Sequence, residues 1–314
     1  MADMLRYNMA CLLAITALTA LLVTDSFAQG TPLVVASIKP VHSLAAAVMG
    51  EVARPTLLVT GGSSGHSATL RPSAVRALQR ARIVFWIGPA LETFLERPLR
   101  ALPASTRVVA LASLPSVTHL PAEVGGSQEN HQAGHAQTPH AQMDPHIWLD
   151  VGNALVMAAA MVRELAALDP VNAPRYRANG GNLAMRLKAL DAELRRRMTP
   201  LAGRPYLVFH DGYRHFERRY GLKSAGFMTA TPQHGPGARR LKELRASIRL
   251  LKVACVFGEP RTSPRLMAAI LEGTDASAGT LDPLGAVLPP GGELYFRLML
   301  GMASGLEACL TPAG

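Results

Sequence analysis

Histidine is concentrated in one part of this chain, where side chains able to bind a metal ion lie close together in sequence. His131, His135, His140 and His146 follow one another at short intervals, and the whole chain has ten histidines. Imidazole nitrogens are common metal ligands, so the segment either collects metal or is a polar tail rich in imidazole. The first three lie in residues 115–143, whose Pro, Gly, Gln and Ser content predicts a loop that can bury little. His146 differs, because it directly precedes the apolar residues IWL.

Two further histidines and one aspartate occupy positions where a metal site forms in an α/β fold. His66 follows a predicted strand through a glycine-rich loop, His210 ends the predicted strand YLVFH, and Asp282 follows a short predicted strand. Ligands of parallel sheets bind beyond the carboxyl ends of the strands, so we expect these residues and His146 to line a cleft between two lobes. Three imidazoles and one carboxylate form a tetrahedral set for Zn²⁺, which such a nitrogen-rich shell favours over Mn²⁺ or Mg²⁺. The spacing lacks a compact metal signature, and a hydrogen-bonded structural histidine at a strand end is the alternative for each.

Alternating strands and helices predict the fold class. Strands are expected at residues 33–40, 55–60, 83–87, 108–111, 205–210, 224–229, 253–259 and just before 281. Helices are expected at residues 41–48, 72–80, 90–99, 151–168, 173–199, 212–220, 238–252, 264–272 and 292–310. Strands that are apolar on both faces and alternate with helices indicate mostly parallel sheets. The sequence therefore predicts an α/β protein with two (βα)n lobes joined by a long rigid helix.

The predicted boundaries divide the chain into four parts. Residues 1–28 are a predicted signal peptide, and residues 29–170 an N-terminal α/β lobe that contains the loop 115–143. Residues 171–200 are the linking helix, and residues 201–314 the C-terminal α/β lobe.

The amino terminus has the three regions of a secretory signal. Arg6 precedes an apolar run over residues 9–23, and Ser26-Phe27-Ala28 supplies small residues at the two positions that signal peptidase reads. The alternative is a membrane anchor, but this run is shorter than the about 20 residues that a membrane span requires. We expect cleavage after Ala28 and a periplasmic mature protein.

The cysteines fit an exported protein. Cys11 lies inside the predicted signal, which leaves Cys255 and Cys309 in the mature chain. Two thiols in one lobe are expected to form a disulfide in an oxidising compartment, and two buried free thiols are the alternative.

The strong positive charge raises the question of nucleic-acid binding. The formal net charge is +10 and the sequence pI is about 10.1. The arginines are spread along the chain, and in residues 238–252 they occupy the polar face of an amphipathic helix that carries no interleaved aromatic residues. The charge is therefore interpreted as a solvated surface that can attract an acidic partner or anionic lipid, and no nucleic-acid partner is expected.

Nearly the whole mature chain resembles a known family, the zinc-binding solute-binding proteins of bacterial ABC importers, of the ZnuA type. The matching segments are, in order, VVASIKPVHSLAAAVM, GGSSGHSATLRPSAVRALQRARIVFWIGPALETFLERPL, DPHIWLD, VFHDGYRHFERRYGL, PQHGPGARRLKEL, CVFGEP and GTLDPLG. The resemblance implies two α/β lobes bridged by one rigid helix, with metal in the cleft between them. It implies that His66, His146 and His210 bind the metal and that Asp282 binds it or stands close by. It also implies a disulfide between the two cysteines of the mature chain.

The resemblance further implies a function and a preferred metal. Such a protein captures Zn²⁺ in the periplasm and delivers it to an inner-membrane ABC permease, is not an enzyme, and is expected to be a monomer. Manganese members carry a glutamate where this chain has His210, which points to zinc. Some zinc relatives have a glutamate immediately before the first histidine, where this chain has Gly65, so Asp282 is expected to complete the shell. The long linking helix predicts only a small motion between the lobes.

Other polar residues receive supporting roles. His42 is a possible auxiliary ligand or part of the cleft wall, and Asp211 either orients an imidazole or caps the helix that follows it. Glu259 ends a strand on the cleft side and is the reserve ligand if Asp282 does not bind. The histidines of loop 115–143 match the His-rich loop of the family, which either captures a second zinc ion or is a polar spacer.

Two other functions remain open from the sequence. An exported zinc hydrolase would keep one coordination position for water and place a general base, such as Glu259, beside it. A solute-binding protein for manganese or iron is the other alternative. A competition titration between Zn²⁺ and Mn²⁺ distinguishes the metals, and an assay for ester or peptide hydrolysis tests the enzyme.

Overall fold

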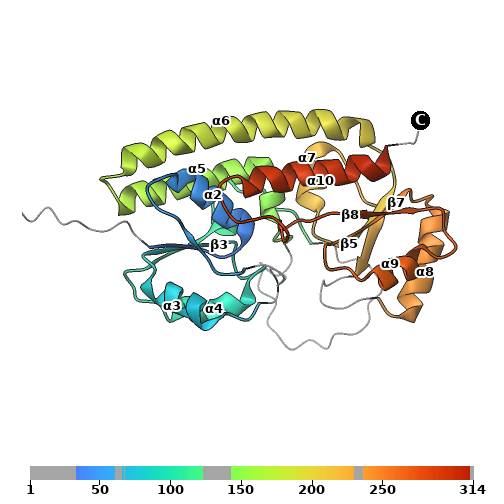
Figure 1. Cartoon of the computed structure of the whole chain (residues 1–314), viewed down its shortest axis with the longest axis horizontal. Helices are drawn as coiled ribbons and strands as arrows, with labels where there is room; N and C mark the ends of the chain where they lie inside the picture. Colours follow the sequence, from blue (N-terminus) through green and yellow to red (C-terminus); the bar gives the residue numbers. More distant parts are fainter. Residues whose placement is uncertain (1–32, 61–65, 67, 123–142, 230–235, 312–314) are drawn as a thin grey trace, which may run out of the picture. The chain divides into compact units, whose positions relative to one another are not determined.

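Two four-stranded parallel sheets form the framework of this protein, as a computed structural model shows (Figure 1). The structure describes residues 33–60, 66, 68–122, 143–229 and 236–311. The predicted signal peptide and three histidines of the loop 115–143, at positions 131, 135 and 140, lie outside the described residues. The fold class predicted from the sequence is confirmed.

The first sheet contains β1 (Val34–Ala36), β2 (Thr56–Leu57), β3 (Ile83–Trp86) and β4 (Arg107–Ala110). Its strands are all parallel, in the order β2-β1-β3-β4. The helices between them are α2 (Lys39–Met49), α3 (Pro72–Arg80) and α4 (Thr93–Arg100). Parallel strands need crossover connections, and these helices provide them on the two faces of the sheet (Figure 1).

The second sheet repeats this topology. It contains β5 (Tyr206–His210), β6 (Gly226–Thr229), β7 (Cys255–Gly258) and β8 (Ser277–Thr280), all parallel and in the order β6-β5-β7-β8. Its helices are α7 (Arg214–Tyr220), α8 (Ala238–Leu250), α9 (Pro264–Leu271) and α10 (Leu294–Leu310). Both sheets thus present the carboxyl end of a central strand, β1 or β5, as a place for ligands.

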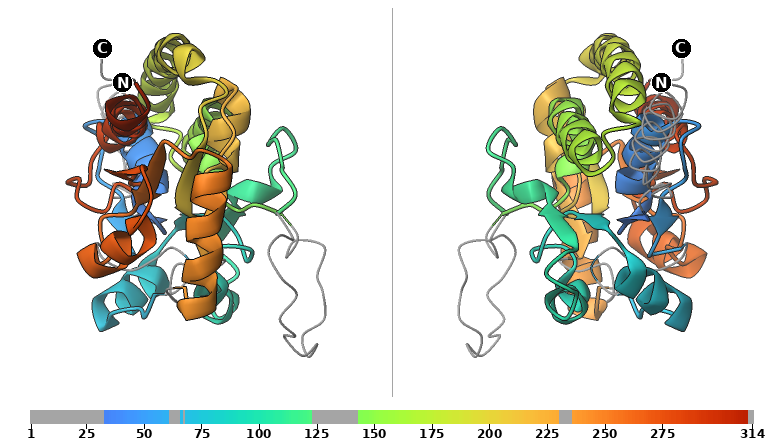
Figure 2. Two further views of the ribbon diagram at one scale, coloured as in Figure 1. Left: turned by 90° about the vertical axis from the view of Figure 1, so that its right-hand side faces the viewer. Right: turned by 90° about the vertical axis from the view of Figure 1, so that its left-hand side faces the viewer.

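Two long helices lie between the sheets in sequence. They are α5 (Val151–Leu168) and α6 (Ala173–Met198), and α6 packs against α2, α5, α7 and α10 (Figure 2). The helices α5 and α6 approach closely at Gly180, where an added Cβ would lie 2.3 Å from Val162 Cγ2. Among the described residues α5 alone is long and apolar enough to cross a membrane, but a buried core helix meets the same test and α5 packs between α2 and α6. The predicted lobe boundaries at residues 170 and 200 remain a prediction.

The boundaries of most elements agree with those expected from the pattern, with one instructive difference at the start. The sequence pattern places Lys39 and Pro40 in the first strand, whereas the strand ends at Ala36 and both residues begin α2. Proline is favoured in the first helical turn because the amide proton it lacks would have no partner there. The difference matters, because it turns the side chain of Lys39 toward a distant part of the chain.

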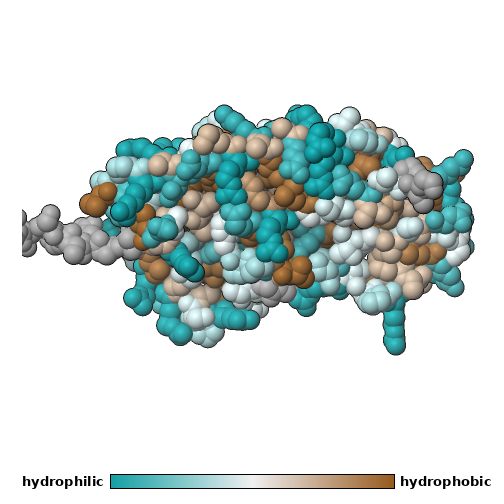
Figure 3. Space-filling model, turned by 45° about the horizontal axis from the view of Figure 1, so that its top comes forward, coloured by the Kyte–Doolittle hydropathy of each residue, from teal (hydrophilic) through white to brown (hydrophobic). Residues whose placement is uncertain are grey.

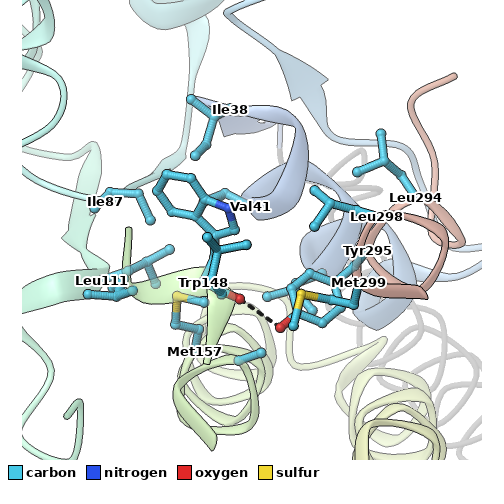
Figure 4. Packing of buried hydrophobic residues seen from close by; sticks show 14 of the residues in the cluster. Ile38, Val41, Ile87, Leu111, Trp148, Met157, Leu294, Tyr295, Leu298 and Met299 are labelled. Carbon is cyan, nitrogen blue, oxygen red and sulfur yellow. Dashed lines mark hydrogen bonds between the residues drawn. The ribbon is translucent and has the colours of Figure 1, made fainter. Parts of the chain in front are cut away.

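The hydrophobic core extends across both halves of the described chain. One cluster of buried residues includes strands of both sheets together with α2, α5, α6 and α10. Trp148 and Tyr295 are completely buried in it, and the Tyr295 hydroxyl donates a hydrogen bond of 2.7 Å to the Trp148 carbonyl (Figure 4). A smaller cluster fills the space between the second sheet and the helices α8 and α9. The larger cluster therefore joins the two sheets through packing as well as through the chain.

Arg219 links the helices α5, α6 and α7 through hydrogen bonds. Arg219 of α7 donates two hydrogen bonds to Asp191 of α6, at 2.6 and 2.8 Å, and a third of 2.7 Å to Asp150. Asp150 also caps α5, because its carboxylate accepts from the backbone N–H of Gly152 at 2.6 Å. A bidentate arginine fixes geometry better than a single ion pair, so α5, α6 and α7 are held at a defined spacing.

The surface agrees with a solvated, charged exterior. In a view that brings the side of α6 and α10 forward, hydrophilic residues dominate and hydrophobic atoms form small separate patches (Figure 3). Two arginines of α8 form ion pairs on the helix surface, Arg239 with Glu243 at 3.2 Å and Arg240 with Glu243 at 3.5 Å. Such exposed pairs contribute little to stability, so the core and the cross-links between elements carry the fold.

The predicted disulfide is confirmed. Cys255 of β7 is bonded to Cys309 of α10, across 54 residues of sequence. The bond fastens the last helix to a central strand of the second sheet.

Removing this bond should lower stability without removing the fold. We expect the double variant Cys255→Ala, Cys309→Ala to lose about 4 kcal/mol of unfolding free energy, because the open loop regains conformational entropy in the unfolded state. Urea unfolding followed by circular dichroism measures the difference. Reductant should destabilise the native protein similarly and leave the double variant unchanged, and an equal effect of reductant on both would contradict the assignment.

Candidate metal centre

Three imidazoles from distant parts of the sequence meet at one point. His66 Nε2 lies 3.2 Å from His146 Nε2, and His146 Nε2 lies 3.2 Å from His210 Nε2. One potential ligand atom from each of the three residues lies within 4.8 Å of the others. Zinc at about 2.05 Å from each nitrogen of a tetrahedron requires nitrogens about 3.3 Å apart. The spacing of the three residues therefore suits one divalent ion.

The ends of the sheets explain why these residues converge. His66 follows β2 of the first sheet, and His210 is the last residue of β5 in the second. His146 immediately precedes a short 3₁₀ helix, Ile147–Leu149, whose three residues are buried. Each half of the described chain thus supplies imidazole to the site. The cleft between two lobes remains a prediction.

A buried carboxylate orients the imidazole of His146. Asp144 Oδ1 lies 2.7 Å from His146 Nδ1 and accepts a second hydrogen bond of 3.0 Å from the His146 backbone N–H. Both side chains are almost completely buried. Burial opposes ionisation of Asp144, but the interactions with His146, together with His215, outweigh burial and lower the pKa of the carboxyl. A carboxylate accepts at Nδ1, so the proton lies there and the Nε2 lone pair faces the cluster.

A second carboxylate plays the same part for His210. Glu259, which follows β7, places Oε1 2.5 Å from His210 Nδ1, and the same oxygen accepts 3.1 Å from the Tyr213 hydroxyl. Burial and then the charge of Glu259 raise the pKa of Tyr213 well above its usual value, so the phenol stays protonated and donates. The Nε2 of His210 is thereby also directed at the cluster.

His66 is held neutral by its surroundings. Burial first, and then the neighbouring His146 and His210, lower the pKa of His66 to about 3. A neutral imidazole keeps the lone pair that a metal requires. The metal-free site is therefore ready to bind a cation without first releasing a proton from His66.

The aspartate expected as fourth ligand lies outside this group. Asp282 Oδ1 accepts from the backbone N–H of Leu284 at 3.2 Å, and Oδ2 accepts from that of Val287 at 3.4 Å. Its carboxylate is close enough to contribute to the raised pKa of Tyr213. Among the described residues only the three histidines form a metal-ligand group, so neither Asp282 nor Glu259 is part of it.

The remaining candidates occupy other positions. His42 belongs to α2, and its Nε2 lies 3.0 Å from the Pro55 carbonyl oxygen, to which an N–H there donates. Asp211 lies 3.9 Å from Arg214, one helical turn further on. Asp144 was missed, although the signal was present in the segment DPHIWLD, where a carboxylate two residues before a ligand can reach its ring.

Residues 34–309 match the protein family described as "Zinc-uptake complex component A periplasmic". The high-affinity zinc uptake system protein ZnuA of Brucella suis biovar 1 is 36% identical over 305 residues, which cover 88% of this chain and 91% of that protein. The protein of the same name from Yersinia pestis is 34% identical over 306 residues, with 93% and 95% covered. The similarity thus extends over nearly the full length of these relatives.

Solved structures agree with the two-sheet architecture. A crystal structure of ZnuA matches with a TM-score of 0.71 at 26% identity and covers 88% of this chain and 99% of its own. A zinc-bound deletion mutant of ZnuA gives 0.73 at 26% identity, with 90% and 100% covered. The Mn²⁺ complex of FpvC from Pseudomonas aeruginosa gives 0.76 at 20% identity, with 90% and 100% covered, a likeness of fold alone.

The carboxylate behind His146 gives a prediction about affinity. Asp144→Asn keeps an acceptor beside Nδ1 but removes the charge, so we expect zinc affinity to fall about 10- to 100-fold, the usual effect of altering a partner of a zinc-bound histidine. Competition against a chromophoric chelator measures it. The exposed Asp275→Asn is the matched control, and equal affinities for the two variants would contradict the role of Asp144.

The depressed pKa of His66 gives a prediction about the metal-free protein. Its folded pKa lies below the value of about 6.5 in the unfolded chain, so the unfolded state binds more protons between these values and stability falls as the pH decreases. At pH 5 the protonation of His66 in the unfolded chain has lowered the unfolding free energy by about 2 kcal/mol, at about 1.4 kcal/mol per pH unit below 6.5. Urea unfolding with chelator present should show that His66→Gln loses less stability than the native protein between pH 7 and 5. Parallel losses in the two proteins would contradict the assignment.

Proposed function

This chain belongs to the family of periplasmic zinc-uptake components, and from that premise we propose that it captures Zn²⁺ in the periplasm and delivers it to an ABC importer. The observation that carries the proposal is the meeting of His66, His146 and His210, with Nε2 atoms 3.2 Å apart in two pairs. The relatives named as high-affinity zinc uptake proteins support the same cargo. The disulfide and the predicted signal peptide fit an exported protein.

The donor set favours zinc over manganese. Three imidazoles suit Zn²⁺, whereas Mn²⁺ prefers more oxygen. Solved structures of similar fold are described with Mn²⁺, Ni²⁺ or Cd²⁺ bound, so the fold by itself does not select the metal. Selectivity in this chain rests on its three nitrogen donors.

Charge balance explains how a buried site can hold a dication. The imidazoles are neutral ligands, and the carboxylates of Asp144 and Glu259 lie directly behind two of them. Together these carboxylates match the charge of Zn²⁺ in surroundings where an uncompensated ion is costly. The fourth coordination position of zinc is filled either by water or by Asp282. Asp282 binds only after it releases the backbone N–H groups of Leu284 and Val287.

Capture fits the site better than hydrolysis. A zinc hydrolase needs a general base that is free to take a proton from the metal-bound water. Glu259, the nearest candidate, accepts from both His210 and Tyr213 and is therefore engaged in orienting the ligand. Absence of ester and peptide turnover by the zinc-loaded protein is the expected result.

Delivery requires a partner. The permease of an ABC importer is the expected recipient, and it must distinguish the loaded from the empty protein. Since both halves of the chain supply ligands, we expect the bound ion to rearrange residues around the site locally, and this is a difference that a permease can sense.

Two variants separate the tight site from the loop. His210→Ala removes one of three ligands and should weaken zinc binding more than about 100-fold, because even the outer partners of zinc ligands contribute up to that amount. Deletion of residues 125–142 should leave the tight site intact and remove only weaker uptake. Calorimetry with Zn²⁺ measures the zinc affinity of both variants, and a titration with Mn²⁺ as competitor measures the metal preference of the native protein.

The exposed His119→Ala serves as control for the loss of a histidine. Tight zinc binding by His210→Ala would contradict the proposed site. Loss of tight zinc binding when residues 125–142 are deleted would contradict it as well. Stronger binding of Mn²⁺ than of Zn²⁺ by the native protein would contradict the proposed cargo.

A further inference from the structure

A segment of the second half of the chain lies against the first half. Residues 282–292, called here the strap, leave the second sheet after β8 and lead into α10, which packs against α2 and α6 (Figure 1). The α-carbon of Ala47 in α2 would lie only 3.5 Å from a Cβ added at Gly292. The strap begins with Asp282, whose charge contributes to the raised pKa of Tyr213, a partner of Glu259.

A lysine from α2 holds the strap through three hydrogen bonds. Lys39 Nζ donates to the carbonyl oxygens of Gly285, Ala286 and Leu288, at 3.0, 2.7 and 2.8 Å. An ammonium group has three N–H donors, so these carbonyls use all of them. The side chain is buried, with 9% of the residue exposed.

The position of this lysine is unfavourable for α2 alone. Lys39 is the first residue of the helix, whose first turn contains no acidic residue. A cation at a helix amino terminus opposes the helix dipole, and burial of the charge adds a further cost. A residue that is unfavourable locally but makes three hydrogen bonds to a segment about 250 positions away indicates a role between the two halves.

Further hydrogen bonds attach the strap beside the metal centre. Trp148 Nε1 donates to the Pro283 carbonyl at 2.7 Å. Trp148 follows the proposed ligand His146 by two residues, and Pro283 directly follows Asp282. At the far end, Ser43 of α2 donates to the Gly292 carbonyl at 3.1 Å. Figure 4 shows Trp148 and Tyr295 joined by a hydrogen bond among apolar side chains of both halves.

We propose that Lys39 is a positioning residue for the metal centre, which it serves by fastening the strap to α2. The proposal rests on the proposed function. The strap continues β8, β8 pairs with β7, and β7 leads to Glu259, which orients His210. Lys39 therefore fixes the C-terminal half of the site relative to His146 before metal arrives, so that zinc spends little of its binding energy on bringing the imidazoles together.

The test compares zinc affinity with stability. Lys39→Met keeps the length and apolar contacts of the side chain but removes the charge and all three donors. We expect its dissociation constant for Zn²⁺ to rise roughly two- to thirtyfold, the range typical of residues that couple distant parts of a site. Lys188→Met, at an exposed position of α6, is the matched control and should bind zinc like the native protein.

Two further measurements identify the cause of a weaker affinity. Amide hydrogen exchange of Leu284 and Val287 should accelerate in metal-free Lys39→Met, because the strap is no longer held. The visible spectrum of bound Co²⁺ should change, because it reports on ligand geometry. A lysine that only stabilises the fold would lower the unfolding temperature and leave affinity, exchange and spectrum unchanged, and that result would overturn the proposal.

Failure of the role of Lys39 is distinguishable from misfolding of the variant and from failure of the proposed function. If Lys39→Met does not fold, Ser43→Ala replaces it, because it loosens the other end of the strap and should weaken zinc binding in the same direction; unchanged affinity would then overturn the proposal. If the native protein itself binds no Zn²⁺, the proposed function fails. If the native protein and Lys39→Met bind equally tightly, only the role of Lys39 fails.

Discussion

The proposed metal centre depends on three imidazole rings being held around one point. The Nε2 atoms lie 3.2 Å apart in two pairs, which is hydrogen-bonding distance. Binding one metal ion through all three requires that the Nε2 atoms carry no proton, so the rings need support from outside the cluster. Asp144 and Glu259 provide it for two rings by accepting at Nδ1, and burial keeps His66 neutral. We expect a dication to bind between these three fixed donors.

The fold supplies this support from two directions. Parallel sheets bring the ligands to the carboxyl ends of their strands, and the packed helices between the sheets hold those ends at one distance. Arg219 fixes α7 against α5 and α6, and Lys39 fixes the strap, residues 282–292, against α2. With ties on both sides of the site, we expect metal capture to rely on local rearrangement around the ligands more than on a large hinge motion.

The sequence could predict what depends on local pattern and strand order. Apolar strands alternating with helices indicated the α/β class, and strand-end positions selected His66 and His210. Asp144 was missed because the spacing in DPHIWLD permits contact with the ring of His146 but does not require it. The expected place of Asp282 in the shell remains a prediction, since its carboxylate now binds the backbone of its own turn, a local preference of aspartate that spacing does not reveal. Lys39 was assigned to a strand because the tertiary contacts that explain its position lie far away in sequence.

The most direct test of the account is anomalous diffraction at the zinc edge from crystals of the zinc-loaded protein. The account predicts one fully occupied zinc ion bound to Nε2 of His66, His146 and His210 at about 2.0–2.1 Å, with Nδ1 of the last two still bonded to carboxylates. A tightly bound ion elsewhere, or one held by fewer than two of these imidazoles, would contradict it.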